Sequence, residues 1–220
     1  MKHQHRLKAI DILLQISIIL AISGCSSAYL GALESIGIPK REVMKFRVEK
    51  ARETQEETKE QFRTTLEKFT ELTNFQGGNL EATYKKLNTA YEASKKKVGE
   101  INHRISEIEK VSDALFSEWE TELDQYSNAK LRSRSEQQLR DTRLQYGQLI
   151  QSMKKAEEKT RPVLSILNDN VLYLKHNLNA KAVSSLQDDL KDIQSDVATL
   201  IEAMEQSIQE SNEFIKTLES

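Results

Sequence analysis

The chain has 220 residues, of which 30% are charged and 38% hydrophobic, with 7 Gly, 2 Pro and a net charge of −2 at pH 7. So few turn-forming residues, together with abundant Glu, Lys, Gln and Leu, are typical of long helices and disfavour a β-sheet domain. The nearly balanced charge gives no general attraction to nucleic acid, so no nucleic-acid partner is expected.

Residues 1–24 have the layout of a bacterial export signal. Three basic residues precede a mostly apolar stretch, residues 10–22, which ends in Ser23 and Gly24. The stretch has about 13 residues, fewer than the ~20 that span a bilayer as a helix, which favours a removable signal. Asp11, at the start of the stretch, is its one unfavourable residue.

The only cysteine of the chain follows directly. The segment Ile22-Ser23-Gly24-Cys25 resembles the lipobox of bacterial lipoproteins. This resemblance implies cleavage between Gly24 and Cys25, with acyl chains added to the new N-terminal cysteine. Two or more acyl chains hold a protein stably on a membrane. By resemblance to lipoprotein sorting in Gram-negative bacteria, Ser26 in place of Asp favours the outer membrane, with the protein facing the periplasm.

Residues 25–40 are expected to form the lipidated cysteine and a tether. Gly31, Gly37 and Pro39 interrupt this segment, which has no sustained hydrophobic period. Residues 41–220 are then a single helical domain, with Pro39 just ahead of its first helix.

Four long helices are predicted, over about residues 41–73, 80–126, 131–176 and 180–218. The second has the clearest heptad seam, with apolar residues on alternating steps of four and three. Its members are Leu80, Tyr84, Leu87, Tyr91, Val98, Ile101, Ile105, Ile108, Leu115, Trp119 and Tyr126. Short turns, the first of which contains Gly77-Gly78, make successive helices antiparallel. The predicted fold is an all-α, elongated antiparallel helical bundle or coiled coil with left-handed packing.

Some seam positions are polar, among them Gln55 and Thr58 in the first helix and Ser94 and Ser112 in the second. Such residues set the register of a bundle more often than they form a site. Pro162 lies inside the third helix, where a kink is predicted rather than a boundary, because the apolar seam keeps its phase across it.

No residue pattern typical of catalysis or of cofactor binding is found. After the signal only His103 and His176 remain, without a second His or a Cys at metal-ligand spacing. Gly77-Gly78 lacks the ending of a phosphate-binding loop, and no Gly-x-Ser-x-Gly turn presents a nucleophile. The sequence therefore predicts no catalytic residues, no metal site and no cofactor.

A candidate interaction tip lies at the turn after the third helix, where Tyr173, Lys175, His176, Asn177 and Asn179 gather. The alternative interpretation is structural: Asn179 caps the fourth helix, Tyr173 packs, and His176 interacts with carbonyl groups at the helix end.

The chain resembles a family of Gram-negative proteins, domain-of-unknown-function family 2959. The resemblance rests on residues 48–52, 74–78, 115–120 and 172–180 and covers essentially all the chain after the signal. It implies a helical envelope protein and supplies no activity, so no catalytic residue is carried over.

The leading hypothesis is a non-enzymatic lipoprotein that acts as a scaffold or interaction module for an envelope protein. A second is a rod that binds membrane or cell wall directly through its basic clusters, Lys95-Lys96-Lys97 and residues 130–143. A third is a ligand carrier or enzyme that uses a polar pocket in the bundle core. A homo-oligomer is left open.

Overall fold

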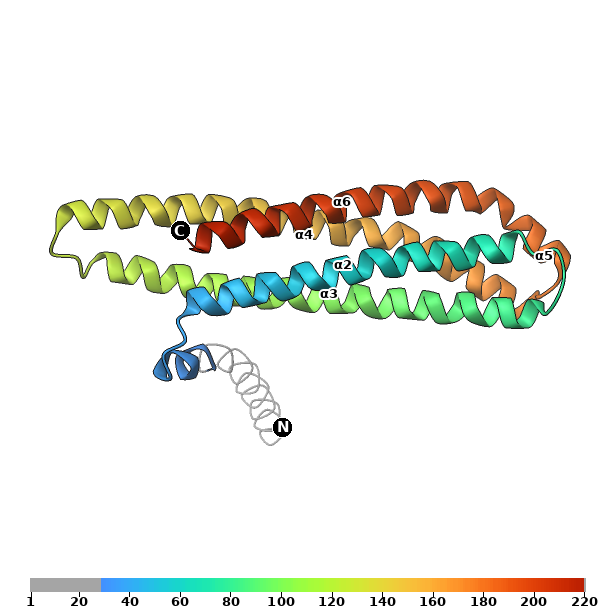
Figure 1. The fold of residues 1–220 in the computed structure, drawn as a ribbon, viewed down its shortest axis with the longest axis horizontal. Coiled ribbons are helices and arrows are strands. Elements are labelled where there is room, and N and C mark those ends of the chain that lie inside the picture. The colour runs from blue at the N-terminus through green and yellow to red at the C-terminus, as the bar shows by residue number, and fades with distance from the viewer. Residues whose placement is uncertain (1–28, 220) are drawn as a thin grey trace, which may run out of the picture.

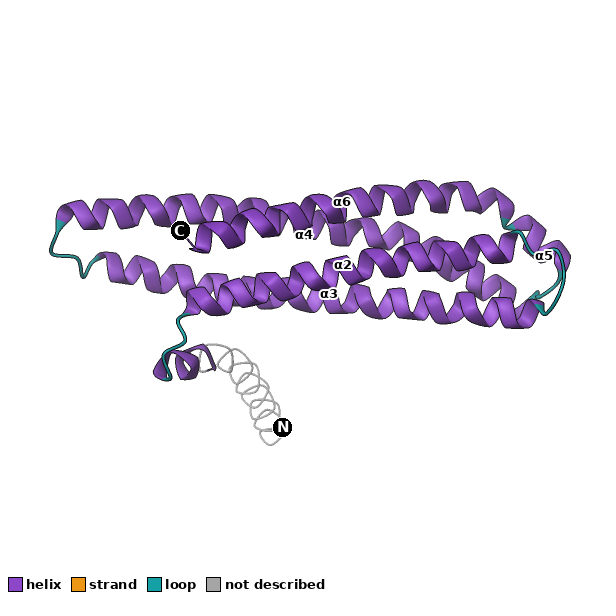
Figure 2. Ribbon diagram, in the orientation of Figure 1, coloured by secondary structure: helices purple, strands orange, loops and turns teal. Residues whose placement is uncertain are grey.

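A computed structural model describes residues 29–219, and within that range it contains helices and no strands (Figures 1 and 2). After a short helix over residues 29–35, the elements are α2 (Lys40–Thr73), α3 (Leu80–Leu123), α4 (Ala129–His176), α5 (Ala180–Ser185) and α6 (Gln187–Glu219). No helix in this part of the chain is long and apolar enough to cross a membrane.

The four long helices lie side by side and antiparallel along one axis (Figure 1). Helices α2 and α4 each pack between α3 and α6, so the bundle is a ring of four helices around a common core. The predicted all-α antiparallel bundle is confirmed, whereas the hand of its packing stays a prediction.

Helices α3 and α4 are longer than the other two and extend beyond them at one end (Figure 1). Near the start of α2, Lys40 pairs with Glu118, and near the end of α6, Thr217 donates a hydrogen bond to Gln145. Residues 119–144 therefore form a helical hairpin that α2 and α6 do not cover, which we call the overhang.

The predicted second seam is buried or half-buried from Leu80 to Trp119, as expected. The prediction fails at its end, because α3 ends at Leu123 rather than at Tyr126, which lies in the turn and is 42% exposed, while Phe116 and Leu123 are buried. In the overhang α3 packs only against α4, so its buried stripe turns toward that neighbour.

Asparagine side chains begin three of the helices. The side chains of Asn79 and Asn179 each accept a hydrogen bond from the backbone N–H three residues later in the chain. The side chain of Asn128 accepts from the backbone N–H groups of Lys130 and Leu131. Such caps satisfy backbone donors that lack a partner in the first helical turn. Because Asn128 is the cap, α4 begins at Ala129, two residues before the predicted start.

The fourth predicted helix is two helices, α5 and α6, separated at Leu186. The Leu186 N–H donates to Val183 O at 3.2 Å, and Ser185 Oγ donates to Ala182 O at 2.7 Å. Helix α4 is continuous through Pro162, as the phase of its seam predicted.

The predicted tether is partly folded. Residues 29–35 are helical and end in a Schellman motif, in which Ile38 N–H bonds Leu33 O at 3.0 Å and Gly37 N–H bonds Glu34 O at 2.8 Å. Gly37 has a φ of +88°, which glycine adopts without strain. The motif brings Ile38 back over Leu33, and Leu33 packs against the core of the bundle.

Candidate functional site

The predicted cleavage and lipidation residues, Gly24 and Cys25, lie outside the described residues. The first described residue, Tyr29, follows Cys25 by four positions. The lipid anchor therefore stays a prediction.

The predicted interaction tip lies at the end of the bundle away from the overhang, beside the turn between α2 and α3 (Figure 1). Asn179 caps α5 by accepting a hydrogen bond from Ala182 N–H at 3.0 Å, as the structural interpretation predicted. Packing of Tyr173 is contradicted, because its side chain is 45% exposed.

The remaining tip residues face solvent. Lys175, His176 and Asn177 are exposed, and the Asn177 side-chain amide donates to Tyr173 O at 3.1 Å. The structure thus gathers these residues on one turn, where Asn177 and Asn179 have structural partners and Lys175 and His176 are open to solvent.

Polar side chains in the bundle core hydrogen-bond to one another and to the backbone. Gln55 and Ser207 exchange hydrogen bonds of 2.8 and 3.1 Å across α2 and α6, and the hydroxyls of Thr65 and Ser94 lie 2.8 Å apart between α2 and α3. Among the described residues, every buried side-chain nitrogen and oxygen has a partner. Of the polar seam residues that suggested a pocket, Gln55 and Ser94 therefore join neighbouring helices, whereas Thr58 and Ser112 donate to backbone carbonyls of their own helices.

No group of three His, Cys, Asp or Glu residues in the described range is placed to hold a metal ion. The two remaining histidines lie apart, with His103 on α3 and His176 at the end of α4.

Large apolar side chains are exposed at three places in the described residues. They are Tyr29, Ile36, Ile38 and Phe46 near the N-terminus; Tyr126, Leu131 and Leu144 on the overhang; and Leu172 and Tyr173 at the opposite tip. Among the described residues, the stretch of the rod between Phe46 and the opposite tip has none. Exposed apolar groups that gather in this way mark contact surfaces, whereas single scattered ones are ordinary.

The N-terminal cluster borders a groove of about 600 Å³, which we call the anchor-proximal groove. Its walls come from the first helix and its cap, from α2 and from α3. The lining residues are Tyr29, Leu33, Ile38, Glu42, Val43, Phe46, Arg47, Lys50, Arg104, Glu107 and Lys110. Among them are four cationic and two carboxylate side chains, so the lining is positively charged.

Lys40 fastens the first helix to the bundle. Its Nζ lies 2.5 Å from a carboxylate oxygen of Glu34 and 2.9 Å from one of Glu118. The hydrogen bond from Lys40 lowers the pKa of Glu34, whereas burial raises the pKa of Glu118. Burial by itself lowers the pKa of Lys40, but the two carboxylates outweigh it and the pKa is raised.

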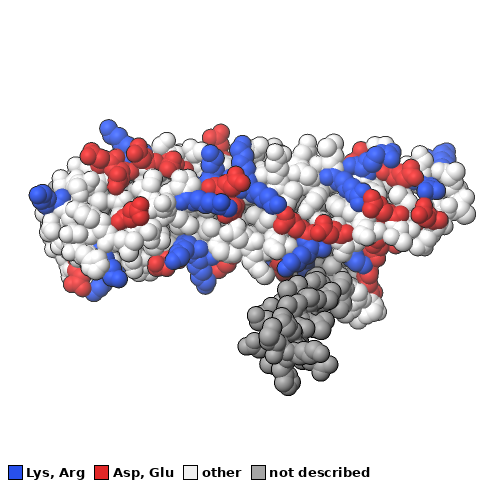
Figure 3. All heavy atoms as spheres, turned by 180° about the vertical axis from the view of Figure 1, so that it is seen from behind, with Lys and Arg blue, Asp and Glu red and all other residues white. Residues whose placement is uncertain are grey.

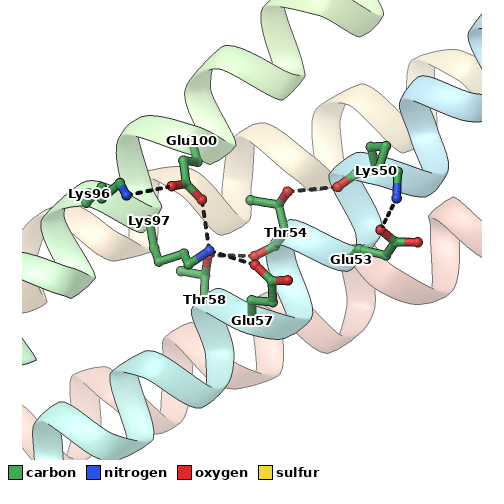
Figure 4. Close-up of polar contacts among 8 residues, drawn as sticks. All are labelled: Lys50, Glu53, Thr54, Glu57, Thr58, Lys96, Lys97 and Glu100. Carbon is green, nitrogen blue, oxygen red and sulfur yellow. Dashed lines mark hydrogen bonds and ion pairs between the residues drawn. The ribbon is translucent and has the colours of Figure 1, made fainter.

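Charges of both signs are interspersed over the visible face of the rod (Figure 3). In the basic cluster of α3, Lys97 bridges Glu57 of α2 at 2.6 Å and Glu100 at 2.9 Å, and Lys96 lies 3.9 Å from Glu100 (Figure 4). Lys95 is exposed and has no ion pair in the described structure.

The basic cluster at the start of α4 is also partly neutralised. Arg132 pairs with Asp124 at 3.0 Å and Glu136 at 3.2 Å, and Arg143 pairs with Glu120. Both basic clusters therefore resemble ordinary solvated helix faces.

The sequence interpretation missed the anchor-proximal groove. Tyr29, Ile36 and Ile38 stand in the segment predicted as a tether, and Phe46 falls outside the seam of the first helix. Apolar residues at positions with no place in the core were the available signal, but only the fold brings them beside the basic residues of α3.

The sequence profile of one protein family, described as Protein of unknown function (DUF2959), matches residues 29–218. Searches of curated proteins and of solved structures found no match. The matched range includes all but the last residue of the described helices, so the chain belongs to the DUF2959 family.

Proposed function

We propose that this chain is a non-enzymatic envelope lipoprotein, held by an acylated Cys25 on the periplasmic face of the outer membrane, that acts as a scaffold for another envelope protein. The observation that carries the proposal is the placement of exposed apolar side chains on the overhang, near the N-terminal segment and at the opposite tip, with none on the stretch of the rod between Phe46 and that tip. This placement favours contacts made at the ends.

The length of the rod would set the distance between the components that the scaffold holds. Helix α4 has 48 residues and runs from the overhang to the opposite tip, which is about 72 Å at 1.5 Å per residue. A bundle with a continuous apolar core keeps its two ends at a fixed separation. Two partners, or a partner and the membrane, would thus be held apart by a set distance.

Photo-crosslinking in living cells tests the scaffold role. A photoreactive phenylalanine analogue replaces Leu131 on the overhang or Tyr173 at the opposite tip, and the control replaces Lys95 in the middle of the rod. We expect an adduct of one defined mass from at least one end position and none from Lys95. Identical adduct patterns from all three positions, or no adduct from either end, would contradict the proposal.

The adduct also identifies the partner. Mass spectrometry of the crosslinked band distinguishes an envelope protein from a second copy of this chain. A band that contains only two copies would replace the scaffold by a homo-oligomer.

The anchor has its own test. Intact-protein mass spectrometry of membrane fractions should find an N-terminal Cys25 that carries acyl chains, and Cys25→Ser should abolish both the modification and signal cleavage. An unmodified, soluble wild-type chain would contradict the anchor while leaving the crosslinking result to be judged separately.

Direct binding of the rod to a membrane surface is a second candidate function. The observation that favours it is the anchor-proximal groove, where exposed apolar side chains meet an excess of cations.

A further inference from the structure

The anchor-proximal groove combines an apolar wall with four cations, two of which have no carboxylate partner in the described residues. Phe46 is 57% exposed and Tyr29 is 55% exposed, while Leu33 and Ile38 line the same hollow. Tyrosine and tryptophan are enriched at the interface between lipid and water, and phenylalanine occurs on the apolar face of helices that lie in that interface. Lys50 Nζ lies 5.8 Å from the centre of the Phe46 ring, so the two types of group are in contact at the rim.

Two of the four cations in the lining have no carboxylate partner in the described residues. Arg47 donates to the backbone carbonyl of Glu107 at 2.6 Å, and Lys110 is exposed without an ion pair. The other two are paired, Arg104 with Glu107 at 3.3 Å and Lys50 with Glu53 at 2.7 Å. The lining also contains Glu42, whose carboxylate has no ion pair in the described residues. An anionic ligand would therefore find two cations without a carboxylate partner, against one unpaired carboxylate, beside an apolar wall.

We propose that the anchor-proximal groove binds an anionic phospholipid of the membrane that holds the anchor. The apolar wall of Tyr29, Ile38 and Phe46 takes the upper part of the acyl chains, and Arg47 and Lys110 face the phosphate. Basic residues next to exposed aromatic and aliphatic ones are the usual recognition chemistry of anionic membrane surfaces.

The position of the groove in the chain favours this occupant over others. This step rests on the proposed anchor at Cys25, four residues before Tyr29. Four extended residues span at most about 14 Å, so the groove must lie close to the membrane surface once Cys25 is acylated. A lipid headgroup is thus at high local concentration at the groove, as a linked ligand would be. The side of the rod near residues 29–50 would then lie on the membrane, leaving the opposite tip free.

Fluorescence quenching by brominated lipids tests the contact directly. The lipidated chain is purified from cells and reconstituted into vesicles in a Trp119→Phe background, with the single tryptophan placed at position 46 by Phe46→Trp. The matched control is Leu144→Trp in the same background, because Leu144 is an apolar residue on the overhang that is at least as exposed as Phe46. We expect vesicles containing brominated phosphatidylglycerol to quench the tryptophan at position 46 and to leave that at position 144 unchanged.

The charge preference is tested in the same preparation. Brominated phosphatidylglycerol should quench more than brominated phosphatidylcholine, and the double variant Arg47→Gln with Lys110→Gln should abolish that difference. Lys95→Gln with Lys96→Gln removes the same charge from α3 outside the groove and should preserve it. Circular dichroism of every variant verifies that the helical content is unchanged.

The outcomes separate this inference from the anchor on which it rests. Vesicles that float with the protein but quench neither tryptophan, or both equally, would overturn the lipid site and favour a protein partner at the groove. If the protein does not float with vesicles, the anchor is wrong. The same brominated vesicles are then added to the free chain, where equal behaviour of the two tryptophan variants overturns the groove as a lipid site.

Discussion

At the scale of single residues, the clearest feature is the buried pair of Gln55 and Ser207. Gln55 is 1% exposed, Ser207 is fully buried, and the two exchange hydrogen bonds in both directions. Replacing one residue of the pair leaves the other as a buried polar group without a hydrogen-bond partner, which is costly. Replacing both by apolar residues leaves no unpaired polar group and costs little. The pair therefore joins α2 to α6 at one register without contributing much net stability.

We predict that Gln55→Leu lowers the free energy of unfolding by about 1–3 kcal/mol, as expected for a lost buried hydrogen bond. The double variant Gln55→Leu with Ser207→Ala should be more stable than Gln55→Leu alone. Urea unfolding followed by circular dichroism measures both.

Thr199→Ala on the exposed face of α6 is the control for this pair, with an expected change within about 0.5 kcal/mol. If the double variant lost the full sum of the two single effects, the pair would be acting through packing rather than through its hydrogen bonds.

Lys40 is the residue that holds the first helix on the bundle, because it pairs with Glu34 of that segment and with Glu118 of α3. We predict that Lys40→Ala speeds amide hydrogen exchange over residues 29–38 while leaving the middle of α3 protected. Lys45→Ala, which removes a pair with Glu219 instead, should leave residues 29–38 unchanged.

The pH dependence of this segment follows from the two carboxylates. The lowered pKa of Glu34 gives a stabilisation that is present above the ordinary glutamate pKa and is lost as the pH falls through the lowered value. Glu118 has a raised pKa, so its effect on stability has the opposite sign: the folded state binds this proton more readily than the unfolded state, and stability rises as the pH falls. After correction for intrinsic exchange rates, acid should loosen residues 29–38 in the wild type and have little further effect in Lys40→Ala.

At the scale of helices, the sequence predicted what heptad seams and turn residues determine. Short turns at 74–79 and 177–179 and the cap at Asn179 lie where the sequence indicated, whereas the cap at Asn79 was not predicted. The break at Leu186 was missed because the apolar seam continues in phase across it. Ser185, which bonds a backbone carbonyl, and two acidic residues in the first turn of α6 are the local signals of that break.

The candidate surfaces were less predictable than the helices. Tyr29, Ile38 and Phe46 stand in poorly patterned sequence, and their meeting with Lys110 depends on how the first helix folds back on α2 and α3. A periodic pattern of apolar residues in a sequence identifies the buried face of a single helix. The groove is lined by three separate segments of the chain, so no periodic pattern in the sequence identifies it.

Pro162 gives a prediction about α4. It lies inside a helix, exposed, and removes one backbone hydrogen bond, which costs about 3 kcal/mol in an ordinary helix interior. We expect Pro162→Ala to raise the free energy of unfolding by about 1–3 kcal/mol in urea titrations. Gly147→Ala is the matched variant on the same helix, where an added methyl group meets no atom within 4 Å and the expected gain is about 0.5–1 kcal/mol.

A loss of stability in Pro162→Ala, alongside a gain in Gly147→Ala, would contradict this prediction. It would mean that the local geometry at Pro162 is needed for the second half of α4 to pack against α3 and α6.

At the scale of the whole molecule, the anchor-proximal groove and the opposite tip lie at different places along one rod (Figure 1). The stretch of the rod between them buries its large apolar residues and pairs many of its charges, so it presents little for a partner to bind. With the proposed anchor and lipid site, one face of the rod would lie on the membrane and the distant tip would be free to meet a second component. The fold would then serve by keeping these two surfaces apart.

The last prediction concerns this shape in solution. A rod about 72 Å long and about 20–25 Å wide has a radius of gyration of about 22 Å, whereas a compact domain of similar chain length has about 16 Å. Small-angle X-ray scattering from the chain without its signal and lipid should give the larger value, with forward scattering of one copy. A value near 16 Å would mean that the overhang folds back on the bundle, and doubled forward scattering would mean that a second copy covers it. Either result would remove the overhang as a surface open to another protein, and the opposite tip would then carry the scaffold role alone.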